Sequence, residues 1–269
     1  MSRFAQETVV ITGGASGIGM ALVQEYLSLG ARVFVLDLKE PQIDSEFQSR
    51  FKFKQTDVSR MEQLQAAFDL LMSEWGAPTL WYNNAGVAAL GAFDAVSQEE
   101  FDRVMEINFG AVVNGTRLAL SAMKPTGRGS IINVASLNGS IAAPFVSSYV
   151  ASKHAVVGFT RALQEEFEQT KSPLRVVLVS PGFVHTPIMK ERDGFKFPNW
   201  LDWIVDQPEK VADEIIRGVS RGHREINPTL HGKVMLKANQ VFPSMVRKSS
   251  RLLTATGVKE LFGFKPIKK

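Results

Sequence analysis

Short apolar runs that alternate with helical patterns constrain the fold of this chain more than any other feature. Most runs are rich in β-branched residues and apolar at consecutive positions, and they cover residues 9–11, 33–36, 51–53, 80–82, 131–134 and 175–179. Apolar residues at helical spacing follow them, over residues 18–29, 61–75, 101–123, 149–169 and 209–219. Strands that are apolar on both faces belong to parallel sheets covered by helices on both sides. The pattern predicts an α/β fold, a doubly wound parallel sheet in three layers that forms a single domain.

The composition excludes several classes of protein. A chain of 269 residues suits one α/β domain, and its lack of cysteine excludes disulfides, thiolate-zinc sites and cysteine nucleophiles. With four histidines and no visible ligand cluster, we expect no catalytic metal. The sequence shows no secretory signal pattern and no long uncharged apolar segment, so we expect a cytoplasmic protein.

A glycine-rich turn follows the first predicted strand. Gly13, Gly17 and Gly19 permit a tight turn into a helix whose N-terminus favours a pyrophosphate, although the spacing differs from the GxGxxG fingerprint. Asp37 ends the second strand, where a carboxylate can accept both hydroxyls of an adenosine ribose and would repel a 2′-phosphate. These residues predict a dinucleotide site. The alternative interpretations are a purely structural turn and an ordinary loop or capping aspartate.

Further residues appear in a fixed order at the predicted strand ends and helix starts. They are Asp57 and Val58, then Asn84, Ala85 and Gly86, then Asn108, Ser136, Tyr149 and Lys153, and finally Pro181, Gly182 and Thr186. In this arrangement the chain resembles the short-chain dehydrogenase/reductase family over residues 7–190, and the resemblance implies a Rossmann fold. It also implies a set of cofactor-binding residues: Gly13, Ser16, Gly17, Ile18, Gly19, Asp37, Asp57, Val58, Asn84, Ala85, Gly86, Tyr149, Lys153, Pro181, Gly182, Val184 and Thr186.

Tyr149 and Lys153 stand four residues apart and share one face of a predicted helix. A free tyrosine has a pKa of about 10, and a neighbouring ammonium would stabilise the phenolate and lower that pKa. A surface pair on an amphipathic helix is the alternative. The resemblance implies that Tyr149 is the general acid or base and that Lys153 lowers its pKa and holds the nicotinamide ribose.

Two more catalytic residues are implied by the resemblance. Ser136 would position and polarise the carbonyl or alcohol. Asn108 would hold a water that links Lys153 to solvent, and its neighbours Ile107 and Gly110 match the family's helix-distorting pattern.

The cofactor is predicted to be NAD. Family members that use NADP carry a basic residue just before the middle glycine or directly after the second strand. Here those places hold Ser16 and Asp37-Leu38, and Lys39 is the nearby cation. A 2′-phosphate would meet a carboxylate, so NAD is preferred over NADP.

Large apolar side chains after the fifth and sixth strands predict a hydrophobic substrate, a secondary alcohol or its ketone of lipid, steroid-like or aromatic type. The predicted substrate residues are Leu137, Asn138, Phe145, Phe183 and His185, with Met189 and Trp200 in a lid over residues 188–207. These aromatic residues could equally form the core under a lid. His185 is expected to shape the pocket or donate hydrogen bonds rather than to act as an acid or base.

The net charge of +4 is unevenly spread. Residues 1–232 sum to −4 and are predicted to form the catalytic domain, whereas residues 233–269 sum to +8 and are predicted to form a basic, apolar helical extension divided at Pro243 and Gly257. Such a segment fits a cover over the substrate entrance, a contact with another subunit, a peripheral helix on a membrane surface or a loosely ordered end. No nucleic-acid motif is present, so no nucleic-acid partner is expected.

The leading hypothesis is an NAD-dependent alcohol dehydrogenase or ketone reductase. A 3-oxoacyl reductase of fatty-acid type is a second possibility, against which its usual NADP preference counts. A dinucleotide-binding regulator without catalysis is a third, although binding alone does not require Ser136, Tyr149 and Lys153 together. The resemblance also implies a homodimer or homotetramer.

Overall fold

The structure, a computed structural model, describes residues 4–186 and 205–244. Most of the predicted lid, with Met189 and Trp200, lies outside the described residues, and so does the extension beyond residue 244. Every other predicted site residue lies within them.

The described chain forms one sheet of seven parallel strands in the order β3-β2-β1-β4-β5-β6-β7. The strand order reverses between β1 and β4, and in such sheets ligands bind outside the carboxyl ends of the strands at this point. The predicted α/β fold is confirmed. The strands are β1 (Thr8–Thr12), β2 (Arg32–Asp37), β3 (Phe51–Gln55), β4 (Leu80–Asn83), β5 (Ser130–Val134), β6 (Arg175–Val179) and β7 (Glu225–Ile226).

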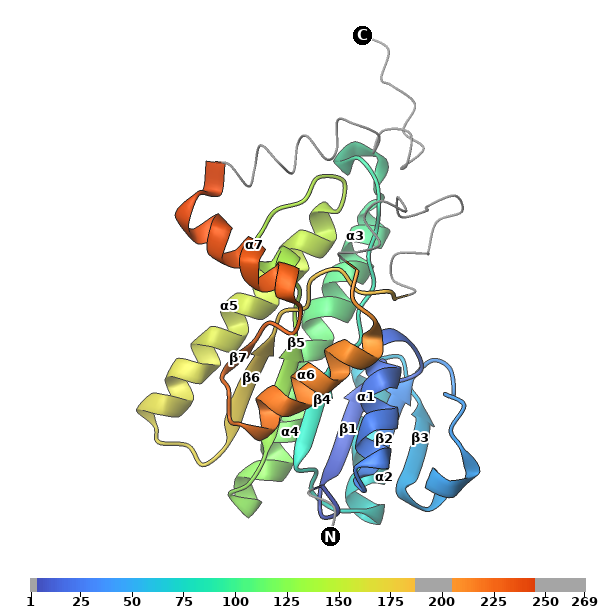
Figure 1. The fold of residues 1–269 in the computed structure, drawn as a ribbon. Helices are drawn as coiled ribbons and strands as arrows, with labels where there is room; N and C mark the ends of the chain where they lie inside the picture. Colours follow the sequence, from blue (N-terminus) through green and yellow to red (C-terminus); the bar gives the residue numbers. More distant parts are fainter. Residues whose placement is uncertain (1–3, 187–204, 245–269) are drawn as a thin grey trace.

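Helices cover both faces of the sheet (Figure 1). Val9 and Ile11 of β1 pack on one face with α1 (Gly17–Ser28) and α6 (Pro208–Ser220). Val10, between them, packs on the other face with α2 (Met61–Glu74) and α4 (Ala111–Thr126). All three side chains are fully buried, which explains why consecutive residues of the strand are apolar.

The long helix predicted over residues 101–123 is interrupted by a π-helical turn. It comprises α3 (Gln98–Met105), which begins with a capping box of Ser97 and Glu100, then a π-helical turn η3 (Glu106–Gly110), and then α4. The distortion expected around Asn108 is confirmed, because η3 contains this residue. Such π-turns often occur at functional sites.

Three short 3-10 helices were not predicted: η1 (Ser45–Arg50), η2 (Phe93–Ala95) and η4 (Leu137–Gly139). The long helix α5 (Ser147–Gln169) follows η4 and carries the predicted catalytic pair. Because η4 begins directly after Ser136, it helps to place that serine at the end of β5.

The last described helix, α7 (Leu230–Val241), lies near the carboxyl ends of β5 and β6 (Figure 1). Its residues Met235 and Leu236 pack against Leu137 and Ile141, which belong to the loop after β5. The predicted boundary between residues 232 and 233 therefore falls inside α7, because this helix is docked on the domain from its first turn. Within residues 4–186 and 205–244, none of the helices has the length and apolar character that a membrane crossing requires.

Candidate active site

The glycine-rich turn has the geometry that requires glycine. Gly13 and Gly17 have φ angles of 68° and 53°, in the left-handed region that L side chains rarely adopt. A Cβ on Gly19 would overlap the backbone oxygen of Gly13, and a Cβ on Gly13 would lie 2.7 Å from the Cα of Ala85. The turn can therefore lie against the end of β4 only with glycine at these positions.

Thr12, which the sequence analysis did not single out, fixes the turn to the end of β4. Its Oγ1 accepts the N–H groups of Asn84 at 2.9 Å and Ala85 at 3.1 Å. In return, the Asn84 side-chain amide donates to the backbone oxygens of Thr12 and Gly13, both at 3.0 Å. A buried threonine at the last position of a strand was the signal that could have revealed this role.

The start of α1 fits a pyrophosphate. The helix has 12 residues, its first turn carries no acidic residue, and Ser16 precedes it in an extended conformation without a capping bond from its side chain among the described residues. The first N–H groups of a helix have no acceptor within it, and together with the helix dipole they favour an anion. Gly17, Ile18 and Gly19 supply these N–H groups.

The Asp37 carboxylate lies beside the same turn. Its Oδ2 accepts the N–H of Ala15 at 2.9 Å, and its Oδ1 accepts the N–H of Lys39 at 3.2 Å. Each carboxylate oxygen keeps a further lone pair. The group is thus held at the position where a ribose bound beside the turn would present its hydroxyls, and the residues fit a nicotinamide dinucleotide.

The predicted adenine contacts, Asp57 and Val58, follow β3. Asp57 Oδ1 accepts the N–H of Ser59 at 3.0 Å and its hydroxyl at 2.7 Å. Val58 is buried in the core under α2, so a contact from this residue to a nucleotide would come from its backbone.

A buried polar network ties β4 to β5 behind the site. The Asn83 side chain accepts the indole N–H of Trp81 at 2.9 Å and donates to Asn133 Oδ1 at 2.8 Å. Asn133 in turn donates to Thr160 of α5 at 3.1 Å. The network links the strand that precedes Asn84 to the strand that precedes Ser136, and so fixes the relative position of the two halves of the site.

Three of the four predicted catalytic groups, Ser136, Tyr149 and Lys153, meet at the carboxyl end of β5. The Ser136 hydroxyl lies close enough to the Tyr149 phenol to lower its pKa, and the Lys153 ammonium donates to the backbone oxygen of Val134 at 2.9 Å. The Lys153 Nζ lies 5.7 Å from the centroid of the Tyr149 ring. Ser136 Oγ also accepts the N–H of Asn138 at 3.2 Å, which fixes its orientation.

The pKa of Tyr149 is raised, whereas the sequence led us to expect that it is lowered. Burial raises the pKa of Tyr149, and the nearby Ser136 hydroxyl only partly offsets this. Burial lowers the pKa of Lys153 to about 8. The expected lowering of the Tyr149 pKa is therefore not seen in the protein alone, because desolvation of the phenol has the largest effect and raises this pKa.

Asn108 is fully buried beside the catalytic group. Its side-chain amide exchanges two hydrogen bonds with the backbone of Val87, at 2.8 and 2.9 Å, and donates to Ser152 at 3.0 Å. A Cβ on Gly86 would lie 3.2 Å from Asn108 Oδ1 and 3.5 Å from Lys153 Nζ, so both side chains face this glycine. Both amide N–H groups of Asn108 are therefore used, and the side chain is held in place beside Lys153.

The loop after β6 lies beside the catalytic group and is held from two sides. The Pro181 oxygen accepts the N–H of Leu137 at 2.7 Å, which joins the loop to the end of β5. The N–H groups of Gly182 and Phe183 donate to Thr229 and His231, at the start of α7. Neither of these two residues was predicted, because no local pattern relates them to a loop almost 50 residues earlier.

The predicted substrate residues occupy different environments. Phe183 is half-buried and stacked on His231, whereas His185 is exposed and its N–H donates to the Asp206 oxygen at 3.1 Å. Phe145 is half-buried with a φ of 65°, and its oxygen accepts the N–H of Gly91 at 2.9 Å. Leu137, in the loop after β5, is buried against α7. In the loop after β6, the predicted cofactor residues Val184 and Thr186 are buried and half-buried, respectively.

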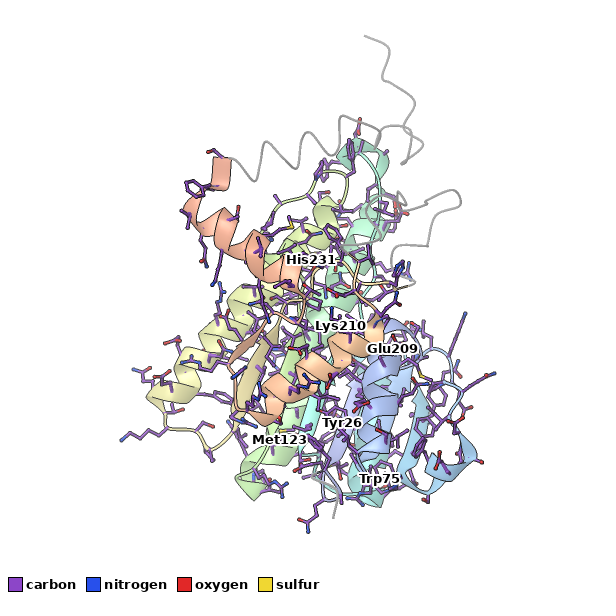
Figure 2. All side chains as sticks on the ribbon, in the orientation of Figure 1. Tyr26, Trp75, Met123, Glu209, Lys210 and His231 are labelled. Carbon is purple, nitrogen blue, oxygen red and sulfur yellow. The ribbon has the colours of Figure 1, made fainter. Side chains whose placement is uncertain are left out.

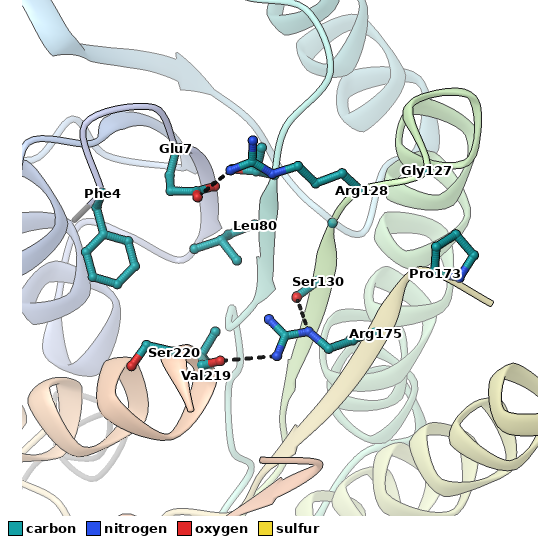
Figure 3. A pocket seen from close by; sticks show the side chains of 12 residues that line it. Phe4, Glu7, Leu80, Gly127, Arg128, Ser130, Pro173, Arg175, Val219 and Ser220 are labelled. Atoms are coloured by element: carbon teal, nitrogen blue, oxygen red, sulfur yellow. Dashed lines mark hydrogen bonds and ion pairs between the residues drawn. The ribbon is translucent and has the colours of Figure 1, made fainter. Parts of the chain in front are cut away.

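A cavity of about 310 Å³ lies at the opposite edge of the sheet, where β4, β5 and β6 begin (Figure 3). Its cations already have partners. Arg128 is paired with Glu7 at 2.5 Å, and Arg175 donates to Ser130 Oγ at 3.1 Å. This cavity is remote from the predicted catalytic group. Across the part of the chain that the structure describes, no three His, Asp or Glu side chains gather as a metal site.

Comparison with known proteins agrees with this geometry. Residues 7–195 match the family described as short chain dehydrogenase. The chain is 31% identical over 276 residues to the oxidoreductase SadH of Mycobacterium tuberculosis, which covers 97% of this chain and 99% of SadH. It is 31% identical over 189 residues to the 3-alpha-(or 20-beta)-hydroxysteroid dehydrogenase of Mycobacterium bovis, which covers 69% of this chain and 72% of that protein.

Solved structures show the same fold. A short chain dehydrogenase/reductase from Burkholderia phymatum in complex with NAD matches with a TM-score of 0.77 at 25% identity, over 91% of this chain and 96% of that one. Structures of this fold include chains bound to NAD and chains bound to NADP.

Proposed function

The chain belongs to the short-chain dehydrogenase/reductase family, and from this premise we propose that it is an NAD-dependent oxidoreductase that interconverts a hydrophobic secondary alcohol and its ketone. The observation that carries the proposal is the meeting of Ser136, Tyr149 and Lys153 at the carboxyl end of β5, beside a turn that fits a dinucleotide. A nicotinamide dinucleotide, when bound, supplies the hydride acceptor or donor.

The chain's own contribution is the proton at the substrate oxygen. Because burial raises the pKa of Tyr149, its hydroxyl is protonated at neutral pH and can donate to a ketone oxygen during reduction. In the oxidative direction Tyr149 must first lose this proton, so alcohol oxidation should gain as the pH rises. Ser136, whose hydroxyl lies beside the Tyr149 phenol, orients the same oxygen.

Replacement of Tyr149 by phenylalanine separates an enzyme from a silent binding protein. Tyr149→Phe removes the transferable proton and should lower kcat by about a thousandfold or more, within the range that acid–base groups contribute, while the dissociation constant for NAD changes little. Absorbance at 340 nm measures turnover, and calorimetric titration measures binding. Unchanged turnover in Tyr149→Phe would exclude the proposed mechanism.

The preference for NAD is supported by the position of Asp37 on the glycine-rich turn and by the absence of an arginine in the 2′-phosphate region, residues 16 and 37–39. Asp37→Ala should reduce the ratio of kcat/KM for NAD over NADP by about tenfold or more, because it removes both a ribose acceptor and a repulsive charge. The exposed Asp44, in the loop after β2, offers a matched control: Asp44→Ala should leave the ratio unchanged.

A hydrophobic substrate is supported by two half-buried aromatic side chains. Phe145 stands four residues before Tyr149, and Phe183 lies in the loop after β6, beside the catalytic group. The similarity to a hydroxysteroid dehydrogenase supports it as well. A panel of steroid, long-chain and aromatic secondary alcohols should give kcat/KM values that rise with apolar area. Higher activity with carrier-bound 3-oxoacyl substrates and NADPH would favour the 3-oxoacyl reductase alternative.

The C-terminal extension is proposed to shape the substrate entrance and to contact a further surface. Its first helix, α7, already packs on the loop after Ser136, and Leu230, Val234, Val241 and Phe242 leave an exposed apolar face. Removal of residues 245–269 should alter the oligomeric state, measured by light scattering, or the binding to anionic vesicles. A truncated protein with unchanged substrate range, assembly and vesicle binding would contradict this role.

A further inference from the structure

Two consecutive backbone N–H groups of the loop after β6 donate to side chains at the start of α7. The N–H of Gly182 donates to Thr229 Oγ1 at 3.1 Å, and the N–H of Phe183 donates to His231 Nε2 at 2.9 Å. Thr229 is fully buried. The N-terminal end of α7 thus holds the loop that carries Gly182 to Thr186.

The fit around His231 is close. Its imidazole stacks on the Phe183 ring with centroids 5.7 Å apart and planes inclined by 15°. A Cβ at Gly182 would overlap both His231 Nε2 and Thr229 Oγ1, so glycine is required for the loop to approach α7. Figure 2 shows His231 at the junction between α7 and the loop, near Lys210 of α6.

The hydrogen bonds determine the protonation state of His231. A backbone N–H can only donate, so Nε2 is the acceptor and the ring proton lies on Nδ1. This Nδ1 is 3.5 Å from Oδ2 of Asp206, whose Oδ1 accepts from Lys210 Nζ at 3.0 Å. Burial lowers the pKa of His231, an effect that Asp206 opposes and Lys210 reinforces, so the ring is neutral at pH 7.

We propose that neutral His231 is a positioning residue that holds the Gly182–His185 loop in the shape that receives the nicotinamide end of the cofactor, and that protonation of His231 releases this loop. The inference rests on the proposed function, because the family resemblance assigns Gly182 and Thr186 to the nicotinamide cofactor that this function requires. It gives the C-terminal extension a direct part in cofactor binding.

The physical reason is the loss of an acceptor. In an imidazolium both ring nitrogens carry protons, so neither orientation of the ring can accept the N–H of Phe183. Protonation would strengthen the attraction to Asp206 but place two donors 2.9 Å apart. The loop would keep its bond to Thr229 and lose the one to His231.

Amide hydrogen exchange of the Gly182–Thr186 segment tests the contact directly, with activity as a separate measurement. Wild-type protein should protect the Phe183 amide at pH 7.5, and this protection, corrected for intrinsic exchange, should fall by about tenfold towards pH 5, as expected from loss of one hydrogen bond. His231→Gln places an amide oxygen near the Nε2 position and should make protection independent of pH. His231→Leu should expose the amide at both pH values.

The affinity for NAD should follow the same pattern. It should weaken by several-fold in the wild type between pH 7.5 and 5, and stay constant in His231→Gln. The exposed His223, in the turn before β7, offers a control. His223→Gln should show the same pH dependence of NAD affinity as the wild type. If His231→Leu does not fold, the wild-type and His231→Gln profiles still decide the proposal.

Two outcomes would overturn the inference. One is a Phe183 exchange profile that is the same in the wild type and in His231→Gln. The other is an NAD affinity that does not change between pH 7.5 and 5 in the wild type. By contrast, pH-dependent exchange and NAD binding in a protein that shows no turnover would support the role of His231 while contradicting the proposed dehydrogenase activity.

Discussion

Two loops at the carboxyl edge of the sheet serve opposite ends of the proposed dinucleotide site, and they are held in different ways. The turn from Thr12 to Gly19 is fixed by its neighbours in the sheet, through Thr12, Asn84 and the close approach of glycine backbones. The loop from Gly182 to His185 is fixed by side chains of α7, which lies outside the sheet.

The difference has a functional consequence. The first loop is held by backbone geometry, by neutral groups and by the Asp37 carboxylate, which accepts the N–H of Ala15, so its shape should be insensitive to the C-terminal extension. The second loop depends on a hydroxyl and an imidazole, so it can be released by protonation or by displacement of α7. A site built in this way keeps its phosphate-binding end constant and makes its reactive end adjustable.

The largest expected effect comes from Gly19→Ala, which tests the rigidity of the first loop. The new Cβ would overlap the backbone oxygen of Gly13, which no side-chain movement can relieve. We expect NAD binding to be lost and the free energy of unfolding to fall by about 3 kcal/mol or more. Calorimetric NAD titration and urea denaturation would measure both.

Gly158 in α5 provides the matched control, since a Cβ there would meet no atom within 4 Å. Gly158→Ala should stabilise the protein by about 0.5–1 kcal/mol, the usual gain for alanine over glycine in a helix. Equal effects of the two changes would show that the first loop is not held sterically.

Lys153 lies between the two loops, and its buried charge predicts a pH dependence. Its folded pKa of about 8 is below the usual value of 10.5, so the unfolded chain binds more protons between these values and stability should rise across this window. From pH 8 to pH 10.5, the free energy of unfolding of the wild type should rise by up to about 3 kcal/mol relative to that of Lys153→Met. Urea denaturation of both proteins over this range would measure the gain, and a constant difference would argue against a buried charge.

The same substitution in both regions gives the most direct comparison. Thr12→Val leaves two backbone N–H groups, of Asn84 and Ala85, without their acceptor, and should lower the free energy of unfolding by about 2–3 kcal/mol. Thr229→Val leaves one backbone N–H group, that of Gly182, without its acceptor and should lower the free energy of unfolding by about 1 kcal/mol. Chemical denaturation would measure the free energy of unfolding of the two variants and show which loses more. Hydrogen exchange should show a local effect around Gly182 for Thr229→Val; a larger global loss for Thr229→Val would reverse the comparison.

The smallest effects are expected on α7, where two neighbouring positions differ. Val234 is 60% exposed, whereas Leu236 packs against the loop after Ser136. Val234→Ala should change stability by less than about 0.5 kcal/mol, and Leu236→Ala should cost about 1 kcal/mol. Thermal unfolding would detect the difference. Equal costs would mean that α7 does not dock through this face.

Much of the fold and of the first loop could be predicted because they follow from local rules. Consecutive buried residues such as Val9, Val10 and Ile11 indicate a two-sided parallel sheet, and the glycine spacing indicates a tight turn before a helix. Tyr149 and Lys153 share a helix face because they are four residues apart. The distortion at Asn108 was expected from the family resemblance and appears as the π-turn η3.

The predictions that failed depend on distant contacts. The boundary between residues 232 and 233 falls inside α7, because this helix docks on Leu137 and Ile141, almost 100 residues earlier in the chain. The expected fall in the Tyr149 pKa was reversed, because that pKa depends on how much solvent the folded chain removes from the phenol. Neither docking nor desolvation leaves a periodic pattern in the sequence.

By itself, the sequence determined the α/β architecture and the glycine-rich turn, since these follow from periodicity and glycine geometry, while the family resemblance indicated which groups can exchange a proton. Only the tertiary structure decided which partners those groups have. His231 and Phe183 are 48 positions apart, and the Lys153 ammonium donates to a strand of the sheet. The reason is physical: hydrogen-bond partners and burial are set by the packing of distant segments, which no local stretch of residues specifies.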